Sequence, residues 1–227
     1  MPRMQLASLI ARLVVLAGVV SSFVWAFWGQ HENIGGFTEI KDGATHVSAG
    51  TSPAAILMSL LGLVVYCILL NTRVKEQEFR VASMWKRAVA FVVDFWFAVF
   101  TLGALFGCVD ILLEANRTGI FRWHFQRDYL VASDGASLVL VFVGLAAFVA
   151  YFLLPLMRRG QTVGCWIFRL ATVNSDGYVI YLPFSIAVRR LFAEFRGVCS
   201  PLKTFRKRDQ QGRTFYDLES GFTVVSY

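Results

Sequence analysis

The sequence predicts an all-α integral membrane protein with four transmembrane helices in two hairpins, followed by a cytoplasmic interfacial amphipathic helix and a short tail hairpin. Hydrophobic residues make up 56% of the 227 residues and charged residues only 16%, whereas about a quarter of the residues in a soluble domain are charged. The apolar residues gather into blocks close to the roughly 20 residues that a spanning helix needs. Helices are expected because an open sheet cannot satisfy its backbone hydrogen bonds in lipid.

Four blocks carry almost no charge: Leu13–Gln30, Pro53–Leu70, Ala88–Val109 and Ala136–Met157. Only the third contains a charged residue, Asp94. The first block loosely fits a secretory signal, since basic residues precede it and residues 24–26 form a small-x-small pattern. Aromatic residues crowd its far end, as they do at a membrane interface, so we expect this helix to be retained.

Charged connectors and turn residues divide the chain into segments. Residues 1–72 form an N-terminal transmembrane hairpin, whose external loop Gly29–Ser52 is rich in Gly, Thr and Ser and is expected to be irregular. Residues 73–84 form a charged cytoplasmic connector. Residues 85–227 hold the other two spanning helices and an interfacial C-terminal region. Their external loop, Asp110–Gly135, mixes aromatic and charged residues and is expected to lie on the membrane surface or to contact a partner.

Basic residues are distributed unevenly between the two sides of the membrane. If both termini are cytoplasmic, 18 of the 22 Lys and Arg residues fall on the inner side. The positive-inside rule favours that orientation, which we assign to a bacterial inner (cell) membrane. The net charge of +7 suits an anionic inner leaflet. No base-reading motif accompanies the charge, so nucleic acid is not an expected partner.

The C-terminal region predicts one amphipathic helix. Pro183 suits the first turn of a helix over Phe184–Arg196, and Gly197 is placed to end that helix. At 100° per residue, the charged residues, among them Arg189 and Arg190, share one arc, and the apolar residues share the other. A spanning helix would bury both arginines, so we expect the helix to lie in the inner interface.

The residues before this helix predict the tail hairpin. The turn signal Asn174–Gly177 separates the apolar runs Trp166–Val173 and Tyr178–Leu182. An Asp-Gly pair between two such runs is typical of a tight turn between strands. Both runs are far shorter than a membrane span.

Asp94 is an ionisable residue inside a predicted span, where a carboxylate costs about 2.5–3.5 kcal/mol at the helix centre. Arg87 stands seven residues earlier, on the same face but about 10 Å away along the axis. Small residues on that face let another helix approach closely. Asp94 is therefore expected to face the bundle and to meet a cation from the inner side. The candidate partners are Arg87, Arg12, Arg169, Arg189 and Arg190.

Two roles are open to this carboxylate. In the first, a fixed ion pair or fixed hydrogen bonds orient the helices and pin the tail to them. In the second, Asp94 binds a cation or a proton in a cavity. The predicted helices contain few other polar residues and no second carboxylate. Transporters usually gather several such groups at one depth, so the structural role is favoured.

The stretch WKRAVAFVVD resembles the defining feature of the RDD family of membrane proteins, which is named for one arginine and two aspartates. Arg87 and Asp94 match the arginine at the start of a helix and the first aspartate within it. Asp217, which is separated from the sequence GFTVV by three residues, is the candidate for the second aspartate. The resemblance covers about residues 80–227.

A second family pattern, a loop that reads roughly G-Q-T-P-G-K, resembles the sequence GQTVGC. The matching residues are Gly160, Gln161, Thr162 and Gly164. Val163 and Cys165 stand where the family usually has Pro and Lys, so any role of that lysine is lost. The resemblance implies a membrane protein; some members look like cation/proton antiporters, and others resemble assembly factors of membrane complexes.

We expect a small membrane subunit or assembly factor of a larger membrane protein complex, with Asp94 in a structural ion pair near the cytoplasmic side. The alternative is a monovalent cation/proton antiporter, or another small transporter, that uses Asp94. Expected partners are membrane lipids and other membrane subunits or further copies of the chain. No enzyme and no cofactor are expected, because no nucleophile and histidine can be brought together. The histidines and cysteines do not cluster, so no metal site is expected either.

Overall fold

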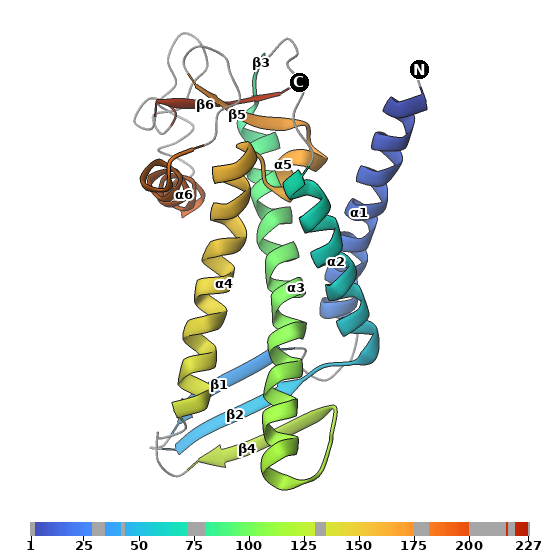
Figure 1. The fold of residues 1–227 in the computed structure, drawn as a ribbon, viewed down its shortest axis with the longest axis vertical. Helices are drawn as coiled ribbons and strands as arrows, with labels where there is room; N and C mark the ends of the chain where they lie inside the picture. The colour runs from blue at the N-terminus through green and yellow to red at the C-terminus, as the bar shows by residue number, and fades with distance from the viewer. Residues whose placement is uncertain are drawn as a thin grey trace. The chain divides into compact units, whose positions relative to one another are not determined.

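Three of the four long helices are long and apolar enough to cross a bilayer. The structure is a computed structural model that describes residues 3–28, 35–41, 44–71, 80–129, 135–174, 182–199, 217 and 221–226. The long helices are α1 (Arg3–Trp28), α2 (Pro53–Asn71), α3 (Met84–Thr118) and α4 (Gly135–Arg159) (Figure 1). The candidate spans are Pro53–Asn71, Met84–Thr118 and Val139–Arg158. The mostly helical architecture is confirmed. In α1 the described apolar stretch is the shorter Ser8–Ser22, so a fourth span stays a prediction.

Helix α3 is longer than the sequence predicted. It continues for nine residues past Val109 into the segment predicted to be an external loop. The apolar side chains that follow Asp110 keep the helical period, and Ile111 is only 2% exposed. The helix ends at Gly119, whose positive φ of 71° and amide hydrogen bond to the Ala115 carbonyl oxygen form a left-handed C-cap.

A three-stranded antiparallel sheet replaces the irregular external loop that the sequence predicted. Strands β1 (Gly35–Lys41) and β2 (Ala44–Gly50) form a hairpin, and β2 also pairs with β4 (His124–Tyr129). The strand order is β1-β2-β4. The ladder is extended by a hydrogen bond from the Thr51 amide to the Trp123 carbonyl oxygen. The prediction of an all-α fold is therefore wrong, because the two segments that the sequence predicted to be external loops satisfy each other's backbone groups.

A second antiparallel sheet joins three distant parts of the chain. It has the order β3-β6-β5 and contains β3 (Arg80–Val81), β5 (Leu170–Asn174) and β6 (Phe222–Ser226). Buried Leu170 and Val224 pack with Ala82 and Ala90 to form its small core. The predicted tail hairpin placed β5 beside Tyr178–Leu182. The described partner of β5 is β6 instead, and residues 175–181 lie outside the described part of the chain.

Two shorter helices complete the fold. Helix α5 (Val163–Ile167) follows the GQT loop, and helix α6 (Phe184–Cys199) starts where the sequence predicted. The Pro183 carbonyl oxygen accepts hydrogen bonds from the second and third residues after Phe184. Gly197 does not end the helix, which continues to Cys199. Helix α6 is seen nearly end-on in Figure 1, crosswise to the last turns of α4.

The chain divides into two compact units, each of which takes segments from both predicted hairpins. One unit contains Met1–Val20, Tyr66–Trp96 and Ala150–Tyr227. The other contains Ser21–Val65 and Phe97–Val149. The hydrogen bonds and ion pairs described below for Asp94 and Asp217 lie within the first unit. The predicted domain boundaries at residues 72 and 84 stay a prediction.

Candidate functional site

Asp94 lies on a face of helix α3 that is lined by small residues. Its side chain is buried, with 2% exposure, and the neighbouring Ala90 and Ala98 are completely buried. Small side chains let another backbone approach α3 at this point. The segment that approaches is the loop and short helix that follow α4.

Both carboxylate oxygens of Asp94 accept hydrogen bonds from that segment. The Thr162 hydroxyl donates to Oδ2 at 2.5 Å, and the Gly164 backbone amide donates to Oδ1 at 2.7 Å. Thr162 is also the N-cap of α5, where its hydroxyl oxygen accepts a hydrogen bond from the Cys165 amide. The carboxylate thus binds the N-terminal turn of α5, whose amides favour negative charge.

Gly164 is required by the closeness of this contact. A Cβ atom built on Gly164 would lie 2.1 Å from the Ala90 carbonyl oxygen and 2.8 Å from Oδ2 of Asp94. Real Cβ atoms do not come that close to a backbone oxygen, so no other residue fits without moving α5. The glycine therefore serves the approach of two backbones rather than a left-handed conformation.

The first two residues of the loop motif attach the loop to the β3-β6-β5 sheet. Gly160 has a positive φ of 61°, and its carbonyl oxygen accepts a hydrogen bond from the Thr172 amide at 2.9 Å. The buried Gln161 side chain donates from Nε2 to the Leu170 carbonyl oxygen at 2.8 Å. The motif therefore connects strand β5 on one side and helix α3 on the other.

Asp217 occupies a second buried charged cluster. Arg87, at the start of α3, donates from Nη1 to Oδ2 of Asp217 at 2.7 Å and from Nη2 to the Val224 carbonyl oxygen at 2.9 Å. Nη2 of Arg190, in α6, lies 3.7 Å from Oδ1 of the same carboxylate. The side chains of Asp217 and Arg190 are 3% and 4% exposed. One carboxylate thus joins α3 and α6 to residue 217.

The arginines considered as partners of Asp94 lie in three different environments. Arg87 and Arg190 both form ion pairs with Asp217. Arg12 is buried, and its guanidinium carbon lies 5.4 Å from the centre of the Trp166 ring, as in a cation–π contact. Arg169 and Arg189 have exposed side chains. Two of the hydrogen bonds to Asp94 come from Thr162 and Gly164, and which of these arginines meets it stays a prediction.

Sequence reasoning did not single out a pair of tyrosines in the same unit. The rings of Tyr66 and Tyr151 stack with centroids 4.9 Å apart, and the Tyr66 hydroxyl donates to the Tyr151 carbonyl oxygen at 3.0 Å. This bond fastens α2 to α4 inside a predicted span. Tyrosines spaced 85 residues apart carry no local signal that they meet.

The chain matches the sequence model of the RDD family over residues 81–218, which is more than half of its length. The matched region includes the arginine and both aspartates of the two clusters, and the predicted resemblance is confirmed. Comparison with curated proteins and with solved structures gives no match. The family match and the three helices of spanning length identify an integral membrane protein.

Proposed function

The chain belongs to the RDD family, and we propose that it is a small non-enzymatic subunit or assembly factor of a larger membrane protein complex. In this role the arginine and the two aspartates fasten the loop, the sheet and helix α6 to the spanning helices. The predicted orientation places that fastened region on the cytoplasmic side of a bacterial inner membrane.

The hydrogen bonds to Asp94 carry the proposal. Each carboxylate oxygen is held by a donor from the protein's own α5 segment. A hydrogen bond to a charged group contributes about 1.5–3 kcal/mol, so releasing both would cost about 3 kcal/mol or more. A transported ion would have to displace these donors in every cycle. A carboxylate that is bound in this way is better suited to a permanent contact.

The cluster around Asp217 supports the same role. Arg87 and Arg190 approach one buried carboxylate from two different helices. Buried ion pairs of this kind are costly to form from hydrated charges, and they favour one arrangement of the parts that they join. The cluster lies where β6 meets the start of α3, so it fixes the sheet on the end of the helix.

Exposed aromatic and basic residues of the same unit are suited to the proposed lipid partner. Trp85 and Phe192 are each 71% exposed, and Phe184 is 60% exposed. Lys86 and Arg189 have exposed side chains beside them in sequence. Amphipathic helices with this composition lie in the interface of anionic membranes. The exposed apolar faces of the spanning helices are left to lipids, to other subunits or to further copies of the chain.

The alternative, a cation/proton antiporter, rests on the burial of one ionisable group within a spanning helix. Asp94→Asn separates the two functions. Asparagine keeps a carbonyl oxygen for the Gly164 amide, and its amide group can donate to the Thr162 hydroxyl. The fastening contacts therefore survive in this variant, whereas a proton-binding or cation-binding carboxylate is lost.

The experiment uses the full chain, purified in mild detergent and reconstituted into liposomes. We expect wild type and Asp94→Asn to purify with the same partner proteins in stoichiometric amounts and to drive no cation-dependent pH change. Asp110→Asn, near the other end of the apolar part of α3, is the matched control for loss of one carboxylate. The proposal fails if the wild type elutes alone and drives a cation-dependent pH change that Asp94→Asn abolishes and Asp110→Asn preserves.

A further inference from the structure

A pocket in the second unit lies between the C-terminal turns of α3 and the segment that leads into β4. It has a volume of about 510 Å³, which is within the range of roughly 300–1,000 Å³ for small-molecule sites. The described residues that line it are Ile111, Glu114, Thr118, Ile120, Arg122, His124 and Phe125. None of them belongs to the clusters around Asp94 and Asp217.

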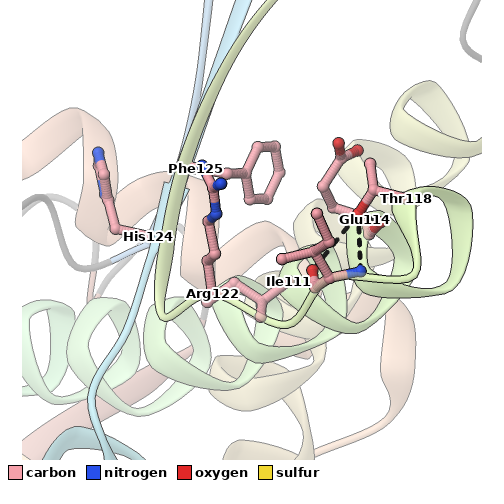
Figure 2. A pocket seen from close by; sticks show the side chains of 7 residues that line it. Ile111, Glu114, Thr118, Arg122, His124 and Phe125 are labelled. Carbon is pink, nitrogen blue, oxygen red and sulfur yellow. Dashed lines mark hydrogen bonds between the residues drawn. The ribbon is translucent and has the colours of Figure 1, made fainter.

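Opposite charges stand on the two sides of this pocket. Figure 2 shows Glu114 and Thr118 on helix α3, facing Arg122 and Phe125 on the returning segment. No hydrogen bond or ion pair joins Arg122 to any other residue in the described part of the chain. The guanidinium is exposed at the pocket and keeps its donors for a ligand.

The α3 end of the pocket favours a cation. The last turn of a helix carries a partial negative charge from its free carbonyl groups, and Glu114 adds a carboxylate at the same place. The Thr118 hydroxyl donates to the Glu114 carbonyl oxygen at 2.9 Å and accepts the Ile120 amide at 3.3 Å, which holds this wall in place. These groups attract an ammonium ion, and the Phe125 ring, which also lines the pocket, adds a face that attracts cations.

The opposite wall favours an anion. Arg122 offers the planar donor set that binds carboxylate or phosphate oxygens in pairs. His124 lines the edge, and its Nδ1 is buried without a hydrogen-bond partner. Ile111 and Ile120 supply apolar surface between the two charged walls.

We propose that this pocket binds a small zwitterion, with its ammonium group at Glu114 and its anionic group at Arg122. The ligand class is an ammonium joined by a short linker to a phosphate or carboxylate. Such a group can come from a free solute or from the headgroup of an aminophospholipid. The site lies in a different compact unit from the fastening residues, so its occupancy does not depend on the function proposed above.

The test is a calorimetric titration of the full chain in an uncharged maltoside detergent with O-phosphoethanolamine. We expect saturable binding, with ethanolamine and inorganic phosphate each at least about tenfold weaker because each lacks one of the two charge-assisted contacts. Glu114→Gln and Arg122→Gln should each weaken O-phosphoethanolamine by about tenfold or more, and Arg122→Lys should lose less. Arg117→Gln, in the same turn of α3 but outside the pocket lining, is the matched control and should bind like the wild type.

The same titration in the presence of phosphatidylethanolamine identifies the source of the ligand. Displacement of the probe by this lipid, but not by phosphatidylglycerol, supports a lipid headgroup, and an unchanged titration supports a free solute. The proposal is overturned if O-phosphoethanolamine shows no saturable binding to folded wild-type protein. It is also overturned if Glu114→Gln and Arg122→Gln, eluting as the wild type does in size exclusion, bind the probe with unchanged affinity.

Discussion

Replacing Gly164 by alanine perturbs the contact that holds Asp94 most directly. The added Cβ would lie 2.1 Å from the Ala90 carbonyl oxygen, and contacts below 3.0 Å are essentially never observed. The oxygen belongs to the backbone of α3 and cannot rotate away. Helix α5 must therefore withdraw from α3 by about 0.9 Å, the difference between these two distances.

That displacement removes the hydrogen bonds to the carboxylate. The bond from the Gly164 amide to Oδ1 of Asp94 would lengthen from 2.7 Å to about 3.6 Å, beyond hydrogen-bonding distance. The Thr162 hydroxyl would be drawn away with it. Each bond to a charged group contributes about 1.5–3 kcal/mol, and overpacking costs about 1–3 kcal/mol. At the lower values the loss is about 4 kcal/mol, or roughly 8–16 °C in melting temperature for a chain of this size.

The assay is thermal unfolding of the full chain in detergent, followed by the height of its size-exclusion peak after heating. Gly103→Ala is the matched control, because it makes the same change in α3 where a Cβ atom meets nothing within 4 Å. Alanine favours a helix by about 1 kcal/mol over glycine, so this control should melt at or above the wild-type temperature. A Gly164→Ala protein that melts within about 2 °C of the wild type would refute the close-contact argument.

Two further predictions concern other contacts. Arg87→Ala removes the guanidinium 2.7 Å from the buried carboxylate of Asp217, and we expect a loss of about 3–5 kcal/mol in unfolding free energy. In the Arg87→Ala background, Asp217→Ala should lower the unfolding free energy much less than it does in the wild type. If the double variant loses the sum of the two single losses to within about 0.5 kcal/mol, the ion pair is contradicted. Gly62→Ala places a Cβ atom 2.8 Å from Oγ1 of Thr101, a side-chain atom. A second replacement, Thr101→Ala, should restore the melting temperature, and a double variant that melts no higher than Gly62→Ala would contradict this.

The spanning helices could be predicted from composition because their signal is local. A stretch such as Pro53–Leu70 has no charge and the length of a bilayer crossing, and α2 occupies that stretch with one added residue. The start of α6 after Pro183 was predicted for the same reason, since its cap is adjacent in sequence. Its end was not, because Gly197 lies inside a helix that continues to Cys199.

The sheets depend on residues that are far apart, and this is why they were missed. The dipeptide Asp42–Gly43 between two alternating runs is a known hairpin signal, but the high content of Gly, Thr and Ser favoured an irregular loop. Strand β4, which completes that sheet, lies more than 70 residues after β2. Strand β6 pairs with β5 and with β3, and no local pattern connects these segments.

The environment of Asp94 was predicted in part. The helical period of the sequence placed Asp94 on a face of small residues, and that face is buried in the structure. A buried carboxylate was expected to meet a cation, since charge neutralisation is the commonest solution. Two of its donors are a hydroxyl and a backbone amide, which the sequence did not predict, and a cationic partner stays a prediction. Both donors belong to the GQTVG motif, which the sequence analysis had identified. Their contact with α3 could not be predicted, because it depends on the close approach of Gly164 to Ala90 in three dimensions.

The coupling energy between Asp94 and Thr162 tests most directly whether Asp94 is a fastening residue. A double-mutant cycle with Asp94→Ala and Thr162→Val, measured by unfolding of the full chain in detergent, isolates the bond from the Thr162 hydroxyl to Oδ2. We predict a coupling of about 1.5–3 kcal/mol, the contribution of a hydrogen bond to a charged group. If the double variant loses the sum of the two single-variant losses in unfolding free energy to within about 0.5 kcal/mol, the account is contradicted, because the carboxylate would then not be holding the α5 segment through Thr162.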